Sequence, residues 1–295
     1  MRDLLDAAPD EVAAERAKVA NEGWGARLLA LQGPDGYWAG DRAFFPKYTS
    51  THSTLTILRE LGLDPQSPEA QRAIARVREN VLFEYDDLPY FGGEVEPCIN
   101  GSAVAIGAYF GQDVRSIVDR LLGDQMEDGG WNCEQERGST RGSFDSTIHV
   151  LEGLLEYEHA TGGSTLLGAA RRRGEAYLLE RRLLRRLSTG EVIEPRFKYL
   201  FQPLPRNMYD ILRGLDYFRA AGLAPDERMT EAVELLEAKR DADGRWPVEY
   251  RYEGDFHFEM DDAEGQPSRW NTLRAMRVLR WWEAVPPSVD PTVEA

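Results

Sequence analysis

Histidine and cysteine are few in this sequence, with four histidines and two cysteines, and three of these residues lie with Asp145 at or near expected helix starts. Asp145 and His149 are four residues apart, which places both side chains on one face of a helix. His52 and Cys98 lie close to the expected starts of two other helices. Aspartate, cysteine and histidine are good zinc ligands, so the sequence predicts a candidate zinc site in these four residues. The alternative is that they are ordinary core residues, and Cys133 is open to the same two interpretations, since a buried cysteine is most often inert.

Aromatic residues are concentrated in four connecting segments, 36–48, 83–93, 196–209 and 246–260. Their ring faces suit an apolar pocket and can stabilise a carbocation. The alternative is a hydrophobic lid, because aromatic loops must pack somewhere. The candidate substrate-binding residues, most of them aromatic, are Trp38, Phe44, Tyr90, Asn100, Phe144, Tyr209 and Trp270.

The elements that would position these residues come from an internal repeat. The template L-x3-[Q/R]-x2-D-G-x-W occurs three times, at residues 28–38, 121–131 and 236–246. Each copy follows a helix-like run and precedes a second helical segment. The glycine supplies the positive φ that ends a helix, the aspartate suits the turn, and the indole is expected to cover the helix end.

The two helices of each pair differ in composition. The first, as in residues 70–80, is amphipathic and charged, which is typical of an outer layer, whereas the second, as in 102–111, is small and apolar on most of its circumference. Alternating strand patterns are nearly absent. The sequence therefore predicts an all-α protein, an α/α toroid of about five helix hairpins with inner and outer layers. An open solenoid of helix pairs is the alternative. We expect one domain over residues 1–284 and a flexible tail over 285–295.

Composition excludes some classes of partner. The chain has 295 residues, 42% of them hydrophobic, and a net charge of −16, so it can build a core but would repel nucleic acid. No run approaches the roughly 18 apolar residues of a transmembrane segment, which leaves peripheral membrane contact open. The N-terminal segment lacks the apolar core of a signal peptide. Two cysteines suit a reducing compartment, so we expect a cytoplasmic location.

The repeated glutamine, Asp-Gly turn and tryptophan resemble the QW repeats of squalene–hopene cyclases and the related repeats of protein prenyltransferase beta subunits. The resemblance covers roughly residues 28–282. It implies the α/α toroid and an isoprenoid substrate. It also implies zinc, because the zinc-dependent prenyltransferases use aspartate, cysteine and histidine as ligands. The Asp-x-Cys pair of that family is absent from this chain.

The same resemblance implies acid chemistry. Squalene–hopene cyclases protonate an alkene with the acid of a D-x-D-D motif, and this chain has only two near matches, at 84–87 and 259–262, which we expect to be solvated loops. In repeat register, Asp145 and Asp210 match the position of the family's acid, and His52 lies at the equivalent start of the first inner helix. These three are the candidate catalytic residues. Simple helix capping is the alternative.

Taken together, these patterns predict a terpene-cyclase-like or prenyltransferase-like enzyme. It would act on an isoprenoid or other small apolar substrate in an aromatic-lined central cavity. The chemistry would come either from an acidic side chain or from zinc, the one candidate cofactor. One alternative is a carbohydrate-active lyase or hydrolase on the same toroid, because aromatic platforms stack sugars and paired carboxylates cleave them. The other is a non-catalytic toroid that binds a partner.

Overall fold

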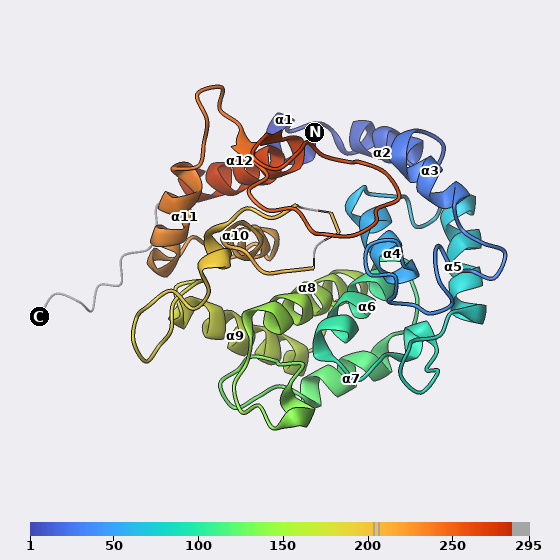
Figure 1. Cartoon of the computed structure of the whole chain (residues 1–295), viewed down its shortest axis with the longest axis horizontal. Coiled ribbons are helices and arrows are strands. Elements are labelled where there is room, and N and C mark those ends of the chain that lie inside the picture. Colours follow the sequence, from blue (N-terminus) through green and yellow to red (C-terminus); the bar gives the residue numbers. More distant parts are fainter. Residues whose placement is uncertain (203, 206, 285–295) are drawn as a thin grey trace, which may run out of the picture. The chain divides into compact units, whose positions relative to one another are not determined.

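The computed structural model describes residues 1–202, 204–205 and 207–284, and it confirms the all-α prediction (Figure 1). In this part of the chain, strands are confined to β1 (Trp246–Pro247) and β2 (Pro267–Ser268), which pair antiparallel. The α-helices are α1 (Arg2–Leu5), α2 (Pro9–Lys18), α3 (Gly23–Ala30), α4 (Thr51–Glu60), α5 (Pro68–Asn80), α6 (Pro97–Tyr109), α7 (Arg115–Gly123), α8 (Phe144–Thr161), α9 (Thr165–Glu180), α10 (Ile211–Ala220), α11 (Thr230–Glu237) and α12 (Arg269–Ala284). Short 3-10 turns are η1 (Tyr90–Gly92), η2 (Gln135–Arg137), η3 (Pro195–Lys198) and η4 (Glu227–Met229). The predicted tail, 285–295, lies outside the described residues.

The chain divides into two compact units. Unit 1 contains residues 1–174 and the short segment 253–259, and unit 2 contains most of the chain from residue 175 onward. Helix α9 runs from one unit into the other. The single domain over residues 1–284 and the ring of five hairpins stay predictions.

In unit 1, three helices of the predicted inner type form the centre. Helix α6 packs on both α4 and α8, and most side chains of the three helices are buried (Figure 1). Helix α3 contacts α4 and α5, and α7 contacts α6. Helices α5 and α7 bury one face only, through apolar residues at helical spacing. Within unit 1 the helices therefore differ in burial in the way that their composition predicts.

Two glycines allow α6 and α8 to pack backbone against backbone. A Cβ atom at Gly101 would lie 2.5 Å from the backbone oxygen of His149, and one at Gly153 would clash with the backbone oxygen of Gly101. Neither position has room for a side chain, so the crossing point is held at the closest approach that two helices can reach. This contact fixes the start of α6 relative to α8.

The three tryptophans of the repeat make the same contact. Each indole N–H donates to the backbone carbonyl ten residues earlier, in the last turns of the preceding outer helix: Trp38 to Leu28 at 2.6 Å, Trp131 to Leu121 at 2.7 Å and Trp246 to Leu236 at 2.7 Å. The carbonyls at a helix C-terminus lack partners within the helix. The tryptophan therefore satisfies one of them while covering the helix end, as predicted.

The glutamine of the repeat joins each turn to the next outer helix. The Gln32 side-chain amide donates to the carbonyls of Gly36, within the turn, and Ala73, on α5. The Gln125 amide makes the equivalent pair of bonds, to Gly129 and to Ala170 on α9. In the third copy arginine replaces glutamine, and the Arg240 guanidinium lies 5.5 Å from the ring centre of Trp246.

Unit 2 is built around α10, which packs against α11 and α12. Asp210 caps α10, and Asn271 in the first turn of α12 donates to the carbonyls of Phe201 and Pro247. These bonds tie the connecting segments to the starts of the buried helices. In the described part of either unit, no helix combines the length and the apolar character needed to cross a membrane.

Candidate metal centre

Two cysteines and a glutamate meet at the start of α6 in unit 1. The Sγ atoms of Cys98 and Cys133 are 2.6 Å apart, with one thiol donating to the other. The Cys98 thiol also lies 3.6 Å from Oε2 of Glu96 and donates to it. The ligand atoms of all three residues lie within 4.8 Å of one another, and no other triad of His, Cys, Asp or Glu in the described chain is this close. We call this group the Cys–Cys–Glu centre.

The turn before α6 holds Glu96 in place. Pro97 opens the helix, where a residue without an N–H loses no hydrogen bond. Asn100 is fully buried, its Oδ1 accepts the N–H of Glu94 at 2.7 Å, and its Nδ2 donates to the Glu94 carbonyl. Gly93 has a φ of 91°, and a Cβ there would meet Asn100 Oδ1 at 2.9 Å. Asn100 therefore clamps the turn that carries the carboxylate.

Cys133 is positioned by the loop that follows Trp131. Its backbone N–H donates to Ser146 Oγ at 3.2 Å, and its Sγ lies 3.2 Å from the same oxygen. The Trp131 N–H donates to Thr147 Oγ1 at 3.0 Å. Ser143 caps α8 by accepting the N–H of Ser146. The loop is thus tied to the first turn of α8, and the crossing of α6 and α8 then brings the two sulfurs together.

The two sulfurs of the centre differ in their electrostatic surroundings. Cys98 lies in the first turn of α6 and Cys133 contacts the first turn of α8, where the helix dipoles stabilise negative charge. The hydrogen bond between the two thiols, together with burial, raises the pKa of the Cys98 thiol well above its ordinary value. The hydrogen bond with Cys98 lowers the pKa of Cys133, and Ser146 adds to this effect. Cys133 is therefore the more acidic of the two thiols.

The donor set suits a soft or borderline divalent ion. Two thiolates and one carboxylate are three protein ligands, which leaves one coordination position open in a tetrahedral zinc site. All three side chains are part-exposed, so a fourth ligand can reach the ion. Two sulfurs on one zinc ion lie about 3.7 Å apart. The thiols at 2.6 Å would therefore open by about 1 Å, which rotation about the Cα–Cβ bonds can supply.

Of the four predicted zinc ligands, only Cys98 belongs to this centre. His52 is buried in the first turn of α4, with Nδ1 3.1 Å from the Tyr90 hydroxyl. Burial lowers the pKa of His52 to about 3, and the nearby His149 adds to the shift. The imidazole is therefore neutral at ordinary pH. Its metal and catalytic roles stay predictions.

Asp145 and His149 share a face of α8, as their spacing predicts. The contact between them runs through the backbone, because His149 Nδ1 lies 2.7 Å from the carbonyl oxygen of Asp145 and donates to it. Neither side chain is part of the Cys–Cys–Glu centre. A catalytic role for Asp145 and a ligand role for either residue stay predictions.

Asp210, the third candidate catalytic residue, caps α10 in unit 2. Its buried carboxylate accepts the N–H of Arg213 at 2.7 Å and the N–H of Phe201 at 3.1 Å. This is the contact that the capping interpretation describes. An acid role for Asp210 stays a prediction.

The predicted substrate-binding aromatics lie mainly in the cores of the units. The Trp38 indole and the Tyr209 hydroxyl donate to backbone carbonyls, the latter to Leu183 at 2.7 Å. Tyr90 stacks on Phe83 with ring centres 5.0 Å apart. The buried members of the set are Trp38, Tyr90, Asn100, Phe144 and Tyr209, and the part-exposed members are Phe44 and Trp270. A substrate role stays a prediction for all of them.

Sequence reasoning missed Glu96 as a member of the Cys–Cys–Glu centre and left Cys133 open. The signal for Glu96 was its position two residues before Cys98, at the start of a helix. No signal in the sequence pairs Cys98 with Cys133, because 35 residues separate them and only the packing of α6 on α8 joins them.

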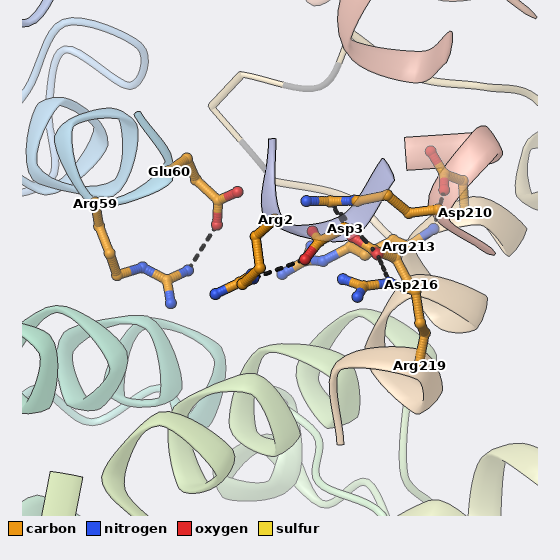
Figure 2. A network of polar contacts seen from close by, with 9 residues as sticks. Arg2, Asp3, Arg59, Glu60, Asp210, Arg213, Asp216 and Arg219 are labelled. Atoms are coloured by element: carbon orange, nitrogen blue, oxygen red, sulfur yellow. Dashed lines mark hydrogen bonds and ion pairs between the residues drawn. The ribbon is translucent and has the colours of Figure 1, made fainter. Parts of the chain in front are cut away.

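The inner helices also carry ion pairs that the sequence did not predict. In unit 1, Arg59 on α4 donates to Glu60 and to Glu156 on α8, each at 2.9 Å (Figure 2 draws the bond to Glu60). In unit 2, Asp216 on α10 accepts from Arg219 at 2.8 Å and from Arg277 on α12 at 3.2 Å (Figure 2 draws the bond from Arg219). These charges lie in mostly buried helices and are paired there.

The comparisons with known proteins identify no relative. No family model matches the chain, no curated protein matches it, and no solved structure matches its fold. The resemblance to cyclase and prenyltransferase repeats therefore rests on the repeated residues themselves.

Proposed function

We propose that this protein is a zinc-dependent enzyme in which Glu96, Cys98 and Cys133 hold the ion. The observation that carries the proposal is the gathering of two thiols and a carboxylate within 4.8 Å at the start of α6. Three ligands and one open position are the pattern of catalytic rather than structural zinc sites. When bound, the ion acts as a Lewis acid and lowers the pKa of a water or substrate thiol at the open position.

The substrate class in this proposal is an isoprenoid, and the architecture is the α/α toroid. Support comes from the three copies of the tryptophan turn, which share one hydrogen-bond pattern, and from the resemblance of their sequence to cyclase and prenyltransferase repeats. The inner helices of unit 1 have small and apolar faces, which suit a hydrocarbon ligand.

Metal content and cobalt spectroscopy test the zinc site. The purified protein should contain one zinc per chain, and the cobalt-substituted protein should show the near-ultraviolet thiolate-to-cobalt charge-transfer band of two sulfur ligands. Cys98→Ser and Cys133→Ser should each weaken this band and lower zinc affinity by at least 10-fold, in line with the loss of a ligand. Glu96→Gln should lower affinity without removing the band.

The matched control is Glu136→Gln. This exposed carboxylate lies in the same loop as Cys133 but outside the centre. It should leave zinc affinity and the cobalt spectrum unchanged. A metal-free protein whose cobalt spectrum lacks the charge-transfer band would refute the zinc site. Binding of a prenyl diphosphate, measured by calorimetry, tests the substrate class separately.

A second candidate function is acid-initiated cyclisation of an isoprenoid at Asp261 in unit 2. This residue belongs to the near match at 259–262, which was expected to be a solvated loop. One carboxylate oxygen instead accepts from Ser268 at 2.5 Å, and the other is buried without a hydrogen-bond partner among the described residues. Burial raises the pKa of Asp261. A raised pKa favours the protonated carboxyl group, and that form can donate a proton to an alkene.

Substitution of this acid distinguishes the two candidates. Asp261→Asn keeps the shape of the side chain and removes the acid, so it should abolish cyclisation of a polyene in the second scheme while leaving zinc content unchanged. Asp262→Asn is the matched control, because it alters an exposed neighbour. Retention of cyclase activity in Asp261→Asn would exclude the acid scheme.

A further inference from the structure

The geometry points to a reversible covalent modification of this protein: Cys98 and Cys133 form an intramolecular disulfide when the protein meets a hydroperoxide. Both cysteines carry free thiols in the structure. The disulfide does not require a metal. Its consequence for zinc rests on the proposed function, because closing the bond removes both thiolate ligands at once.

The distance between the sulfurs is the first support. They lie 2.6 Å apart, whereas a disulfide bond is about 2.0 Å long and two thiolates on zinc are about 3.7 Å apart. The pair is therefore closer to the disulfide than to the zinc-bound arrangement. About half an ångström of side-chain movement closes the bond.

The second support is that the backbone holds the pair together. Cys98 lies on α6, and Cys133 is bonded to Ser146 on α8 through both its N–H and its sulfur. Gly101 and Gly153 lock the two helices at backbone contact close by. The sulfurs thus meet without any helix having to move, which raises the effective concentration of one thiol at the other.

The chemistry balances with hydrogen peroxide as the oxidant. The thiolate of Cys133, which lies on the loop, attacks one peroxide oxygen. The O–O bond breaks, and the departing hydroxide takes up a proton and leaves as water, so that Cys133 becomes a sulfenic acid. The Cys98 sulfur then attacks the Cys133 sulfur, the S–O bond breaks, and the hydroxyl leaves as water with the Cys98 proton. Two thiols and one peroxide give one disulfide and two waters.

Thiol counting and peptide mapping test the inference. The reduced protein should alkylate at two cysteines, and after stoichiometric hydrogen peroxide it should alkylate at none, with a new cross-linked peptide joining residues 98 and 133. Dithiothreitol should restore both thiols. In Cys98→Ser the reaction should stop at a sulfenic acid on Cys133, trapped by a dimedone-type reagent. Two free thiols after peroxide treatment, or a disulfide only between chains, would overturn the inference.

Glu96→Gln separates this inference from the proposed function. The variant should lose zinc affinity yet still close the disulfide, because both sulfurs keep their positions. In the zinc-loaded protein, peroxide should release one zinc per chain, measured with a chromophoric chelator. If the disulfide forms in a protein that never binds zinc, the proposed function fails and the modification stands. If zinc binds and both thiols survive peroxide, the modification fails and the proposed function stands.

Discussion

At the scale of single residues, the candidate metal-binding group lies where two helix starts meet. The sulfurs of Cys98 and Cys133 lie 2.6 Å apart, and the Glu96 carboxylate accepts from the Cys98 thiol beside them. Asn100 bonds to the turn that carries Glu96, and its role as a substrate contact stays a prediction. The side chains of the centre are held in position by the amide of Asn100 and the hydroxyl of Ser146.

The titration of His52 yields a prediction for stability against pH. Burial lowers the pKa of His52 from 6.5 to about 3, so the folded state favours the neutral ring. Its contribution is fully present above pH 6.5 and is lost as the pH falls toward 3, since the unfolded chain then binds a proton that the folded chain excludes. We expect urea denaturation to show a loss of about 2–4 kcal/mol from this group over that window.

The comparison with the His52→Gln variant isolates the pH-dependent contribution of His52 to stability. Tyr90 and His149 face His52, and Tyr90 stays neutral throughout this range because burial raises its pKa. The variant should lose less stability than the parent protein between pH 6.5 and 4. Identical pH profiles for the two proteins would show that His52 is not the group responsible.

At the scale of elements, close contacts between backbones decide where the side chains meet. Helices α6 and α8 pack through Gly101 and Gly153, and the tryptophan turns close the ends of outer helices. The glycine contact joins two helices that are far apart in the sequence, whereas the tryptophan contact joins residues ten apart. A mutation at each contact is therefore expected to destabilise the fold for a different reason.

Gly153→Ala should be strongly destabilising, because its methyl group would clash with the Gly101 carbonyl on the neighbouring helix. We expect a loss of about 3 kcal/mol or more in urea denaturation. Gly168→Ala on α9 is the matched control: a Cβ there meets only the end of the Arg172 side chain. Alanine should stabilise that helix by about 0.5–1 kcal/mol. Equal effects at the two sites would contradict the tight crossing.

Trp131→Phe should leave the buried Leu121 carbonyl without the indole N–H that donates to it at 2.7 Å. We expect destabilisation of about 1–3 kcal/mol beyond the loss of ring volume, measured by thermal unfolding. The same change at the part-exposed Trp282 should shift stability by less than about 0.5 kcal/mol. If both variants unfold at the same temperature, the turn contact is not a source of stability.

At the scale of the whole molecule, the excess of negative charge is expected to affect stability. A net charge of −16 on 295 residues makes the folded state repel itself, and the ion pairs of Arg59 and Asp216 offset this only locally. The division into two units places separate buried helix groups along one chain. Conditions that screen charge should therefore act on the stability of the entire protein.

Salt should raise the melting temperature. Increasing the ionic strength from about 0.01 M to about 0.5 M shortens the screening length several-fold and weakens repulsion among the excess carboxylates. We expect an increase of several degrees in calorimetry, the same with sodium chloride as with choline chloride. A lower melting temperature in salt would mean that attractive ion pairs outweigh the net repulsion.

The sequence by itself determined the helical class, the inner and outer composition of the helices and the tryptophan turns. These features depend on interactions among neighbours: the period of apolar residues, the positive φ of glycine, and an indole that reaches a carbonyl ten residues away. It also singled out Cys98 and the helix starts as places for chemistry. Asp145 and His149 share a helix face as their spacing predicts, but neither side chain belongs to the Cys–Cys–Glu centre.

Only the tertiary structure decided which residues form the centre. Cys98 and Cys133 are 35 residues apart, and their contact depends on the packing of α6 on α8 through Gly101 and Gly153. The spacing of the two cysteines in the sequence does not predict this contact. The crossing point depends on two glycines, which lie on helices far apart in the chain. The repeat can be predicted from residues close together in the sequence, whereas the site depends on one long-range contact between two helix backbones.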